Sequence, residues 1–325
     1  MKTGKIEDIC TLLRKKLEEA VEKRSYDSAF LSGGLDTSVI NYIASRQGND
    51  FESISVGFED SSMKDLKYAE IIEEELNLDL HVFTFDFEEA KNAARDVVEI
   101  MRSFDPIEIR NDISLHIGLK KAKELGLESI LTGDGSDELL AGYPFLYKLP
   151  QDEMEEELDK IWRVMNFSSQ QIGKNLGISV ELPYLDEQFK KFAMNISSDV
   201  KVGEWNEEKF GKWILRKAYE DKLPIEIIWR KKIPIEIGSG TTILPDKFKS
   251  NLDEDYFKAK KEEVAKEDEV LVRSEEQLFY YQIYKSLYGP PKAEDPDKSK
   301  CPYCKTNVSE KVTFCRTCGS GLGKQ

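Results

Sequence analysis

Residues 29–40 read AFLSGGLDTSVI, and the rest of the fold can be worked out from this stretch. An apolar run gives way to two glycines, one acid and three hydroxyl residues, and then becomes apolar again. The flanking residues predict a short buried strand over 27–31 and a helix over 37–46, so the glycine turn joins a strand to a helix. Such a turn either only connects the two elements or also presents its backbone N–H groups to an anion.

The turn carries the groups that an anion needs. Gly33 and Gly34 allow close approach because they lack a Cβ atom, and the start of the helix supplies backbone N–H groups. Hydroxyl donors stand beside them at Ser32, Thr37 and Ser38. The GxxxxGK[ST] spacing of a Walker A loop, with its lysine, is absent. The heptad SGGLDTS therefore predicts a site for a phosphate of ATP, whereas a glycine pair alone would equally fit a plain connecting turn.

An aspartate within an anion-binding turn needs an explanation. Asp36 would repel a polyphosphate, but a bound Mg²⁺ ion would bridge the carboxylate and the phosphates. Mg²⁺ commonly takes one or two protein carboxylates, so a second acidic turn is expected. Residues 131–143, LTGDGSDELLAGY, contain such a turn, and we expect Asp137 to be the second ligand. The alternative is that these acids form a solvated helix cap.

The surrounding sequence shows strands that alternate with helices. Alternating apolar positions predict strands, and apolar positions at helical spacing predict helices. Strands are expected over 51–58, 80–85 and 127–131, and helices over 5–24, 64–76, 87–100 and 113–125. This order predicts βαβ units around a parallel sheet, with ligands beyond the carboxyl ends of the strands. From Asp152 onward the pattern is mainly helical.

Composition excludes several classes of protein. The chain has 325 residues, of which 40% are hydrophobic and 34% charged, as is typical of a globular protein. It contains no apolar run of about 18 residues, so no membrane span is predicted, and the N-terminus reads as a charged helix rather than a signal peptide. We therefore expect a cytoplasmic location. The net charge of −15 disfavours a broad nucleic-acid-binding surface, and two histidines make a histidine-rich metal site or a Ser-His-Asp triad hard to build.

Residues 301–321 read CPYCKTNVSEKVTFCRTCGSG. Two CxxC pairs stand ten residues apart, and four thiolates at this spacing can close tetrahedrally on Zn²⁺. A closed site has no open coordination position, so we interpret Cys301, Cys304, Cys315 and Cys318 as the ligands of a structural zinc ribbon. Disulfides are disfavoured in a cytosolic chain, and iron in a rubredoxin-like centre is a lesser alternative. The ribbon is too short to bury a core, so the metal is expected to fold it.

The purpose of the ribbon is open from the sequence alone. It follows a linker, residues 289–300, which reads GPPKAEDPDKSK. Basic residues give the tail a modest positive character: Lys292, Lys298, Lys300, Lys305, Lys311, Arg316 and Lys324. Three roles fit this pattern, namely docking of a protein partner such as an amidotransferase, binding of RNA, and stabilisation of the domain.

The two turns together resemble a known superfamily. SGGLDTS followed by GDGSDELLAGY is similar to the PP-loop ATP pyrophosphatases and, within them, to the synthetase domain of asparagine synthetases. The resemblance runs from about Ile6 to about Asp246 and includes SISVGF (53–58), SFDPIEIR (103–110), LPYLD (182–186) and WRKKIP (229–234). It implies an α/β fold of the PP-loop, or adenine nucleotide α-hydrolase-like, type, with a parallel sheet flanked by helices and a helical C-terminal portion. It also implies ATP binding, cleavage between the α- and β-phosphates, and release of pyrophosphate.

The resemblance further implies roles for single residues. Lys232 matches the lysine that stabilises the acyl-adenylate and the later tetrahedral oxyanion. Arg110 matches an arginine in the substrate-facing segment, where its fork would bind a carboxylate. Positions that contact the adenosine in the family correspond to Leu31, Val56, Thr132 and Gly133. The expected domains are an N-terminal helix packed on the core (1–25), the ATP pyrophosphatase domain (26–288), the linker (289–300) and the zinc ribbon (301–325).

Three departures from the family pattern matter. Asp134 stands where asparagine synthetases carry a glutamate, which is one methylene longer, so its reach as a catalytic acid or base is altered. Glu181 replaces the arginine of the family's Glu-x-Arg segment. We also expect no glutaminase half and no N-terminal nucleophilic cysteine, because Lys2 follows Met1 and the helix before the synthetase core starts almost at once. The expected nitrogen donor is therefore ammonia, a partner amidotransferase or another amine.

The sequence thus predicts an AMP-forming carbon–nitrogen ligase of the asparagine synthetase type, with aspartate as one candidate for the activated carboxylate. One alternative is a PP-loop enzyme that thiolates tRNA, in which the ribbon would hold RNA. RNA is not favoured, because no cysteine lies near the glycine turn for sulfur chemistry and GDGSDELLAGY is similar to the asparagine synthetase branch. Another alternative is a nucleotide-binding protein with little turnover. The departures from the family pattern at Asp134 and Glu181 favour keeping this alternative.

Overall fold

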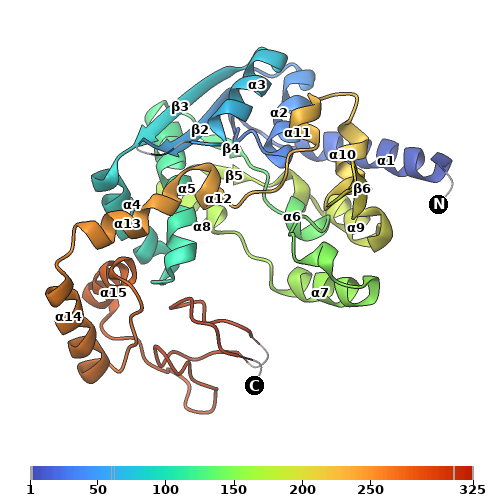
Figure 1. The fold of residues 1–325 in the computed structure, drawn as a ribbon. Coiled ribbons are helices and arrows are strands. Elements are labelled where there is room, and N and C mark those ends of the chain that lie inside the picture. Colours follow the sequence, from blue (N-terminus) through green and yellow to red (C-terminus); the bar gives the residue numbers. More distant parts are fainter. Residues whose placement is uncertain (1–2, 60, 62, 310–311, 324–325) are drawn as a thin grey trace. The chain divides into compact units, whose positions relative to one another are not determined.

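The computed structural model describes residues 3–59, 61, 63–309 and 312–323. Within these residues, five strands form one sheet in the order β3-β2-β1-β4-β5 (Figure 1). The strands are β1 (Ser28–Phe30), β2 (Glu52–Phe58), β3 (Asp79–Phe85), β4 (Ser129–Leu131) and β5 (Ser179–Glu181). Strand β1 pairs in parallel with β2 and with β4, and β4 pairs in parallel with β5. The predicted α/β fold with a parallel sheet is confirmed.

Helices make up most of the remaining described chain. The α-helices are α1 (Thr3–Glu22), α2 (Leu35–Gln47), α3 (Leu66–Leu76), α4 (Phe87–Met101), α5 (Pro106–Glu124), α6 (Ser136–Leu139), α7 (Gln151–Val164), α8 (Ser168–Leu176), α9 (Glu187–Asn195), α10 (Trp213–Tyr219), α11 (Ile225–Ile228), α12 (Ile235–Gly238), α13 (Leu244–Ser250), α14 (Glu254–Glu267) and α15 (Glu275–Tyr288). Short 3₁₀ helices are η1 (Leu146–Lys148), η2 (Pro183–Leu185), η3 (Ser198–Val200) and η4 (Thr241–Ile243), and β6 (Gly203–Trp205) pairs antiparallel with β7 (Glu208–Phe210). The predicted helical C-terminal portion is therefore present.

Two elements differ from the expectation. Helix α5 begins at Pro106, well before the predicted start at residue 113. Proline suits the first turn of a helix because its missing N–H needs no partner there, and Asp105 Oδ1 accepts the Ile107 N–H at 3.0 Å. Strand β5 has three residues, Ser179–Glu181, and is too short to show a period-two pattern. Its pairing with β4, rather than its own sequence, makes it a strand.

The order of the strands reverses between β1 and β4. Strands β2 and β3 follow β1 on one side, whereas β4 and β5 lie on the other side. Ligands of open parallel sheets bind beyond the carboxyl ends of the strands at such a reversal. The glycine turn follows β1 and the acidic turn follows β4, so both motifs of the sequence lie at this position.

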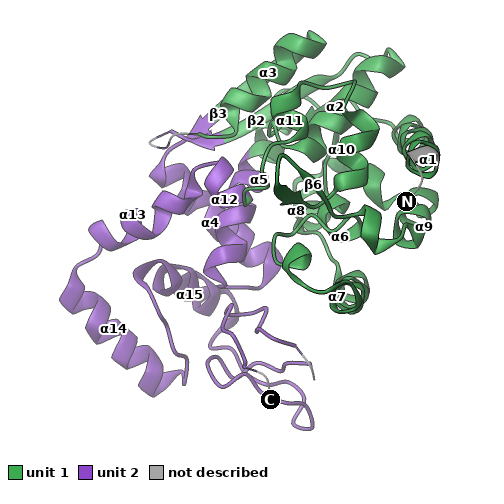
Figure 2. Cartoon of the chain, turned by 45° about the vertical axis from the view of Figure 1, so that its right-hand side comes forward, with its two compact units in different colours: residues 1–56, 63–83, 118–234 green, residues 57–62, 84–117, 235–325 purple. Residues whose placement is uncertain are grey.

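The chain contains two compact units (Figure 2). Unit 1 consists of Met1–Val56, Met63–Phe83 and Gly118–Pro234. Unit 2 consists of Gly57–Ser62, Thr84–Ile117 and Ile235–Gln325. The units are groups of residues in mutual contact, and the domain boundaries expected from the sequence stay a prediction.

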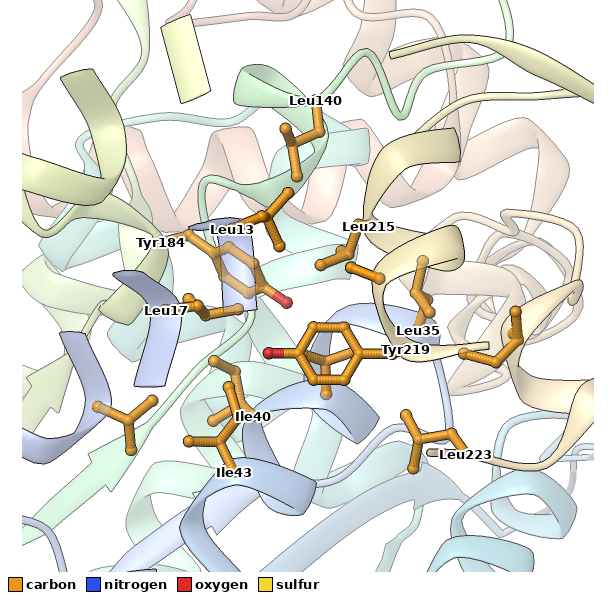
Figure 3. Packing of buried hydrophobic residues seen from close by; sticks show 14 of the residues in the cluster. Leu13, Leu17, Leu35, Ile40, Ile43, Leu140, Tyr184, Leu215, Tyr219 and Leu223 are labelled. Carbon is orange, nitrogen blue, oxygen red and sulfur yellow. The ribbon is translucent and has the colours of Figure 1, made fainter. Parts of the chain in front are cut away.

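The core of unit 1 forms around α1. Apolar residues at helical spacing place Leu13 and Leu17 on the face of α1 that packs against α9, α10 and α2. Figure 3 shows these leucines in one cluster with Tyr184 and Tyr219. Leu13 and Leu17 have no exposed surface, so replacing either with alanine would lower the free energy of unfolding by about 2–5 kcal/mol. This packing fixes α10, which follows Lys212 directly.

Unit 2 is mainly helical. Helix α15 packs against α4, α13 and α14. The segment that carries the four C-terminal cysteines has two isolated β-bridges, between Lys300 and Asn307 and between Phe314 and Gly321. Among the helices of the described residues, none is long and apolar enough to cross a membrane.

Candidate active site

The glycine turn after β1 has an internal hydrogen-bond network. The Ser32 N–H donates to Thr37 Oγ1 at 3.1 Å, and the Ser32 hydroxyl lies 3.0 Å from the same oxygen. The Gly34 N–H donates to Ser32 Oγ at 3.3 Å. Gly34 is the N-cap of α2, and as a glycine it has no side chain that could accept the N–H groups of the first turn. The first turn of α2 therefore offers backbone N–H groups to an anion.

Gly33 is required by the packing of this turn. Its φ angle is +66°, which favours glycine. A Cβ atom at this position would lie 2.4 Å from the backbone nitrogen of Ala69 and 2.5 Å from atoms of Tyr68. The start of α3 thus packs directly against the turn and fixes its shape.

The acidic turn after β4 touches the glycine turn. A Cβ atom added to Gly133 would lie 2.8 Å from the Cβ atom of Asp36. The Thr132 N–H donates to Glu181 O at 3.0 Å, which extends the pairing of β4 with β5. The turn then leads into α6, whose first turn contains Asp137.

Four charged side chains of unit 1 form an alternating chain. Lys212 Nζ lies 2.5 Å from Asp36 Oδ2 and 2.6 Å from Asp137 Oδ1. Lys232 Nζ lies 2.7 Å from Asp137 Oδ2. The Lys212 side chain is only 3% exposed, so water screens these contacts weakly. The structure therefore brings the two predicted metal ligands and the predicted catalytic lysine into one cluster.

The lysines control the charge of Asp137. Burial raises the pKa of Asp137, but the ammonium groups of Lys212 and Lys232 outweigh burial and hold the pKa well below its usual range. Burial lowers the pKa of Lys232, but Asp137 and then Asp36 outweigh burial and raise it above its usual value. Both Asp137 and Lys232 are therefore charged at neutral pH.

The residues present fit a divalent cation. Asp36 Oδ1 is buried and has no hydrogen-bond partner among the described residues. A buried carboxylate oxygen without a partner costs free energy unless a donor or a cation satisfies it. Mg²⁺ prefers oxygen ligands, and Asp36 and Asp137 offer two carboxylates close enough to share one ammonium group. The donor set therefore fits a Mg²⁺ ion, and the Mg²⁺ site itself stays a prediction.

Lys212 is a site residue that the sequence does not reveal. It stands in FGKWILRK, where a lysine beside an amphipathic helix is typical of a solvated charge. In the structure its backbone adopts a left-handed conformation with φ at 54°, and its N–H donates to Leu140 O at 2.9 Å. The position of Lys212 therefore depends on packing between segments far apart in the sequence, and no local pattern carries that information.

Arg230 supports the glycine turn and was also not evident from the sequence. Its Nη1 donates to Gly33 O at 2.9 Å, and its Nη2 pairs with Asp65. The guanidinium carbon lies 3.9 Å from the centre of the Tyr68 ring. Arg230 stands two positions before Lys232 in the WRKKIP segment, so this segment both braces the turn and supplies the lysine.

Asp134, the other predicted catalytic residue of this turn, has hydroxyl partners. Ser169 Oγ donates to Asp134 Oδ2 at 2.5 Å, and the Asp134 N–H donates to Thr132 Oγ1 at 3.3 Å. Burial raises the pKa of Asp134, and the opposing effects of Ser169, Thr132 and Lys232 are smaller. A carboxyl group with a raised pKa is suited to proton transfer. Ser169, on α8, carries no signal in the sequence that would connect it to Asp134.

The positions predicted to contact adenosine lie on neighbouring strands. Val56 is on β2, Leu31 directly follows β1, and Thr132 directly follows β4. Leu31 is fully buried in the core of unit 1, and its N–H donates to Ile54 O at 2.9 Å. Thr132 is 4% exposed. The strand order β2-β1-β4 brings these residues, with Gly133, toward one edge of the sheet.

Glu181, which departs from the family pattern, forms an ion pair with an arginine of unit 1. Arg24 Nε lies 3.5 Å from Glu181 Oε2, and the Ser179 hydroxyl donates to Glu181 Oε1 at 2.8 Å. Arg24 Nη2 also donates to Leu182 O at 3.0 Å. The acidic residue at this position is thus matched by an arginine that follows α1.

Arg110 belongs to unit 2 and has two carboxylate partners there. Its Nη1 lies 2.8 Å from Glu276 Oε2, and its Nε lies 3.2 Å from Glu236 Oε2. The Tyr280 hydroxyl donates to Glu276 Oε1 at 3.1 Å. Glu276 is 2% exposed, and its burial raises its pKa to about 7 although Arg110 and Tyr280 favour the charged form. The guanidinium predicted to bind a substrate carboxylate is therefore engaged by two glutamates in this structure.

The four cysteines predicted to bind zinc form one cluster. The sulfur atoms of Cys301, Cys304, Cys315 and Cys318 all lie within 4.8 Å of one another, and all four thiols are buried and free of disulfides. Four thiols so arranged fit a tetrahedral zinc site. The Gly319 N–H donates to Cys315 O at 2.7 Å and closes the turn that contains the second pair.

Comparison with known proteins identifies the family. The family described as asparagine synthase matches residues 12–175 and 167–302 of this chain. The chain is 33% identical over 251 residues to the root asparagine synthetase (glutamine-hydrolysing) of Pisum sativum, and 31% identical over 252 residues to an asparagine synthetase (glutamine-hydrolysing) of Asparagus officinalis. These alignments cover 70% of this chain but 43% and 42% of the two plant proteins, so the chain spans less than half of their length.

A solved structure gives a weaker similarity. NMN synthetase from Francisella tularensis is 13% identical to this chain, with a TM-score of 0.33, over 90% of this chain and 98% of that one.

The family match covers both turns and all four members of the Asp36, Lys212, Asp137 and Lys232 cluster. The resemblance seen in the two turns is thereby confirmed, and the chain belongs to the asparagine synthase family.

Proposed function

We propose that this chain is an ATP-dependent, amide-forming ligase of the asparagine synthetase type. A carboxylate oxygen of the substrate attacks the α-phosphorus of ATP, the bond to the bridging oxygen breaks, and pyrophosphate leaves. An amine nitrogen then attacks the carbonyl carbon of the acyl-adenylate, loses a proton and displaces AMP. The observation that carries this proposal is the alternating cluster of Asp36, Lys212, Asp137 and Lys232 beside the glycine turn.

The two turns would bind the nucleotide. The phosphate-binding residues of the proposal are Ser32, Gly33, Gly34, Thr37 and Ser38, and the adenosine contacts are Leu31, Val56, Thr132 and Gly133. Asp36 and Asp137 would hold Mg²⁺, which when bound supplies positive charge to phosphate oxygens. Lys212 balances the charge of both aspartates, which favours their close approach.

Three further side chains would act on the substrates. Lys232 stays protonated because its acidic neighbours raise its pKa, so its ammonium group can donate hydrogen bonds to an oxyanion. Asp134, whose pKa is raised by burial, would accept the proton that the attacking amine loses. Arg110 would bind a carboxylate of the acyl substrate through its bidentate fork.

The remaining assignments belong to the same proposal. The acyl substrate is a small-molecule carboxylate, with aspartate as the first candidate, and the nitrogen comes from ammonia or from a partner amidotransferase. The four cysteines would hold a structural Zn²⁺ ion. The enzyme is proposed to work in the cytoplasm.

Pyrophosphate release tests the proposal directly. The full chain is incubated with ATP, Mg²⁺, aspartate and ammonium, each omitted in turn, and asparagine is measured by chromatography. Release that requires a carboxylate, with an amide as product, is expected. Lys232→Ala should retain ATP binding and lose product, whereas Lys231→Ala, at a neighbouring side chain that is 69% exposed, should stay active. No carboxylate-dependent release with any carboxylate tested would overturn the proposal.

The same assay distinguishes the alternatives. ATP consumption that depends on tRNA would favour the thiolating enzyme, and ATP binding without pyrophosphate release would favour a nucleotide-binding protein. The arrangement of cysteines does not favour thiolation. Cys10 is buried in α1 beside Ile214 O, and the other four form the thiol cluster.

A further inference from the structure

The second cysteine pair is tied to the segment that begins α5. The Phe104 N–H donates to Thr317 O at 2.7 Å, and the Ser103 hydroxyl donates to Arg316 O at 2.9 Å. Both carbonyl groups belong to the two residues between Cys315 and Cys318. We refer to residues 315–319 as the cysteine turn. This turn thus holds the chain immediately before α5.

Asp105 adds a second connection between the cysteine turn and α5. A Cβ atom added to Gly319 would lie 2.2 Å from Asp105 Oδ1, so the cysteine turn and Asp105 are in direct contact. The same oxygen accepts the Ile107 N–H, in the first turn of α5, at 3.0 Å. The Asp105 carboxylate therefore contacts both the cysteine turn and the start of α5.

The cysteine turn is also tied to the start of α15. Gln277 is fully buried, and its Nε2 donates to Cys318 O at 2.8 Å. Arg273 Nη2 donates to the same oxygen at 2.9 Å. Gln277 Oε1 accepts from the backbone N–H and the Nε of Arg273, at 2.9 and 3.2 Å. Two side chains that bond to each other thus hold the carbonyl group of a metal-binding cysteine.

Arg110 joins the same two helices. It lies on α5, and its partner Glu276 lies on α15 directly before Gln277. Glu276 is 2% exposed, so its ion pair with Arg110 requires α5 and α15 to keep their spacing. The helices are therefore connected twice near their N-termini, once by Arg110 and once through the cysteine turn.

The cysteine turn has no apolar core to fix it. Among the described residues of 301–318, the buried side chains are the four cysteines alone. Bonds from the four sulfurs to a metal would therefore set the geometry of the turn. Without them, we expect the carbonyl groups that receive hydrogen bonds from α15 and from the segment before α5 to lose their fixed positions.

From these contacts we propose that the metal-loaded cysteine turn positions Arg110, so that metal binding by the four cysteines orders the helices that carry the carboxylate-binding arginine. The role of Arg110 toward a carboxylate rests on the proposed function. The coupling between the cysteines and α5 rests on the hydrogen bonds alone, so the two can fail separately. The four-cysteine segment is in this view a part of the substrate site's support.

Hydrogen exchange tests the coupling without any turnover. The full chain loaded with zinc is compared with the same chain after a chelator has removed zinc. The Phe104 amide, which donates to Thr317 O, should exchange at least about tenfold faster without zinc. The Leu31 amide, which donates to Ile54 O within unit 1, should exchange at the same rate in both forms. Equal exchange of Phe104 in both forms would overturn the proposal.

Variants that keep all four cysteines complete the test. They remain informative even if zinc removal accelerates hydrogen exchange throughout the chain. Ser103→Ala and Arg273→Met should retain zinc and raise KM for the carboxylate by about three- to tenfold, with kcat and ATP affinity within about twofold. Ser286→Ala is the matched control, because its hydroxyl donates to Ile283 O at 2.7 Å in the same helix, α15. It should change nothing.

The outcomes separate this proposal from the proposed function. Ser103→Ala and Arg273→Met proteins with wild-type KM and wild-type exchange at Phe104 would overturn the coupling. If no carboxylate supports turnover, the proposed function fails. Faster exchange at Phe104 in the two variants, with Leu31 unchanged, would then still support the coupling, and unchanged exchange would overturn it.

Discussion

Ser169 Oγ lies 2.5 Å from Asp134 Oδ2, so a serine on α8 holds the carboxyl group that stands where asparagine synthetases carry a glutamate. Aspartate is one methylene shorter, and a fixed hydroxyl donor gives the shorter side chain a defined direction. Thr132 Oγ1 accepts the Asp134 N–H at 3.3 Å and fixes the backbone of the same residue. The substitution therefore comes with its own support, which favours a working acid or base over a site that has lost its function.

Ser169→Ala should move the pH dependence of activity to higher pH. The Ser169 hydroxyl favours the charged form of Asp134, so its removal raises the pKa of Asp134 further. A carboxylate that accepts a proton must be ionised, so activity rises as pH rises through this pKa. The acidic limb of kcat/KM should therefore shift upward by up to about one pH unit.

The control for this shift is Ser45→Ala, whose hydroxyl donates to Tyr42 O at 2.8 Å within α2. Its pH profile should coincide with that of the wild type. If the Ser169→Ala profile coincides with it as well, Asp134 does not act as the base.

The two turns were predictable from the sequence because their chemistry is local. SGGLDTS places glycines, hydroxyl groups and an acid within seven residues. The apolar residues on either side of it follow patterns that predict a strand before the turn and a helix after it. Asp137 followed from the need for a second carboxylate, and the structure places it on the same lysine as Asp36. The four cysteines are equally local, because their spacing alone defines a thiol cluster.

The supporting residues were not predictable, because their roles arise from long-range packing. Lys212, Ser169 and Glu276 read as ordinary surface residues, yet each is nearly buried and contacts a predicted site residue. Strand β5 was not predicted for a related reason, because its pairing with β4 defines it as a strand. Packing partners of this kind leave no period and no spacing in one sequence.

Lys212→Met should destabilise the chain in a way that Mg²⁺ partly reverses. The change removes the ammonium group that Asp36 and Asp137 share, and breaking a buried ion pair costs about 3–5 kcal/mol of the free energy of unfolding. A cation that binds the two carboxylates in the folded state restores part of that loss. Urea unfolding with and without Mg²⁺ measures both effects, and Mg²⁺ should stabilise the variant more than the wild type.

Lys217→Met, on α10, the helix that Lys212 directly precedes, is the matched control. Its partner Glu220 and its own side chain are about one-third exposed, so the loss should be at most about 1 kcal/mol. Equal losses in the two variants, or a Lys212→Met protein that does not respond to Mg²⁺, would contradict the metal assignment of the two aspartates.

Cys301→Ser combined with Cys304→Ser should abolish zinc binding. The wild type should contain about one zinc per chain by elemental analysis, as a four-thiolate site requires. The double variant keeps two of the four clustered thiols and should retain well below that amount, with a lower unfolding temperature. Cys10→Ser, at a buried thiol outside the cluster, should keep its zinc. Undiminished zinc in the double variant would remove these cysteines from the metal site.

Glu276→Gln should flatten the dependence of stability on pH. Burial raises the pKa of Glu276 from 4.5 to about 7, although the charge of Arg110 and the Tyr280 hydroxyl lower it, and the negative charge of Glu236 raises it further. Between these two values the folded state keeps a proton that the unfolded state has lost, so the free energy of unfolding falls as pH rises. The fall should be on the order of 3 kcal/mol in the wild type and absent in the variant.

Urea unfolding from pH 4.5 to 7.5 measures this slope. Glu275→Gln is the matched control, because Glu275 is the preceding residue of α15 and is only partly buried. Its slope should equal that of the wild type. The same slope in Glu276→Gln would mean that Glu276 is ionised in the folded state over this whole range. Its carboxylate would then offset the charge of Arg110 at every pH of interest, and a substrate carboxylate would have to compete with it.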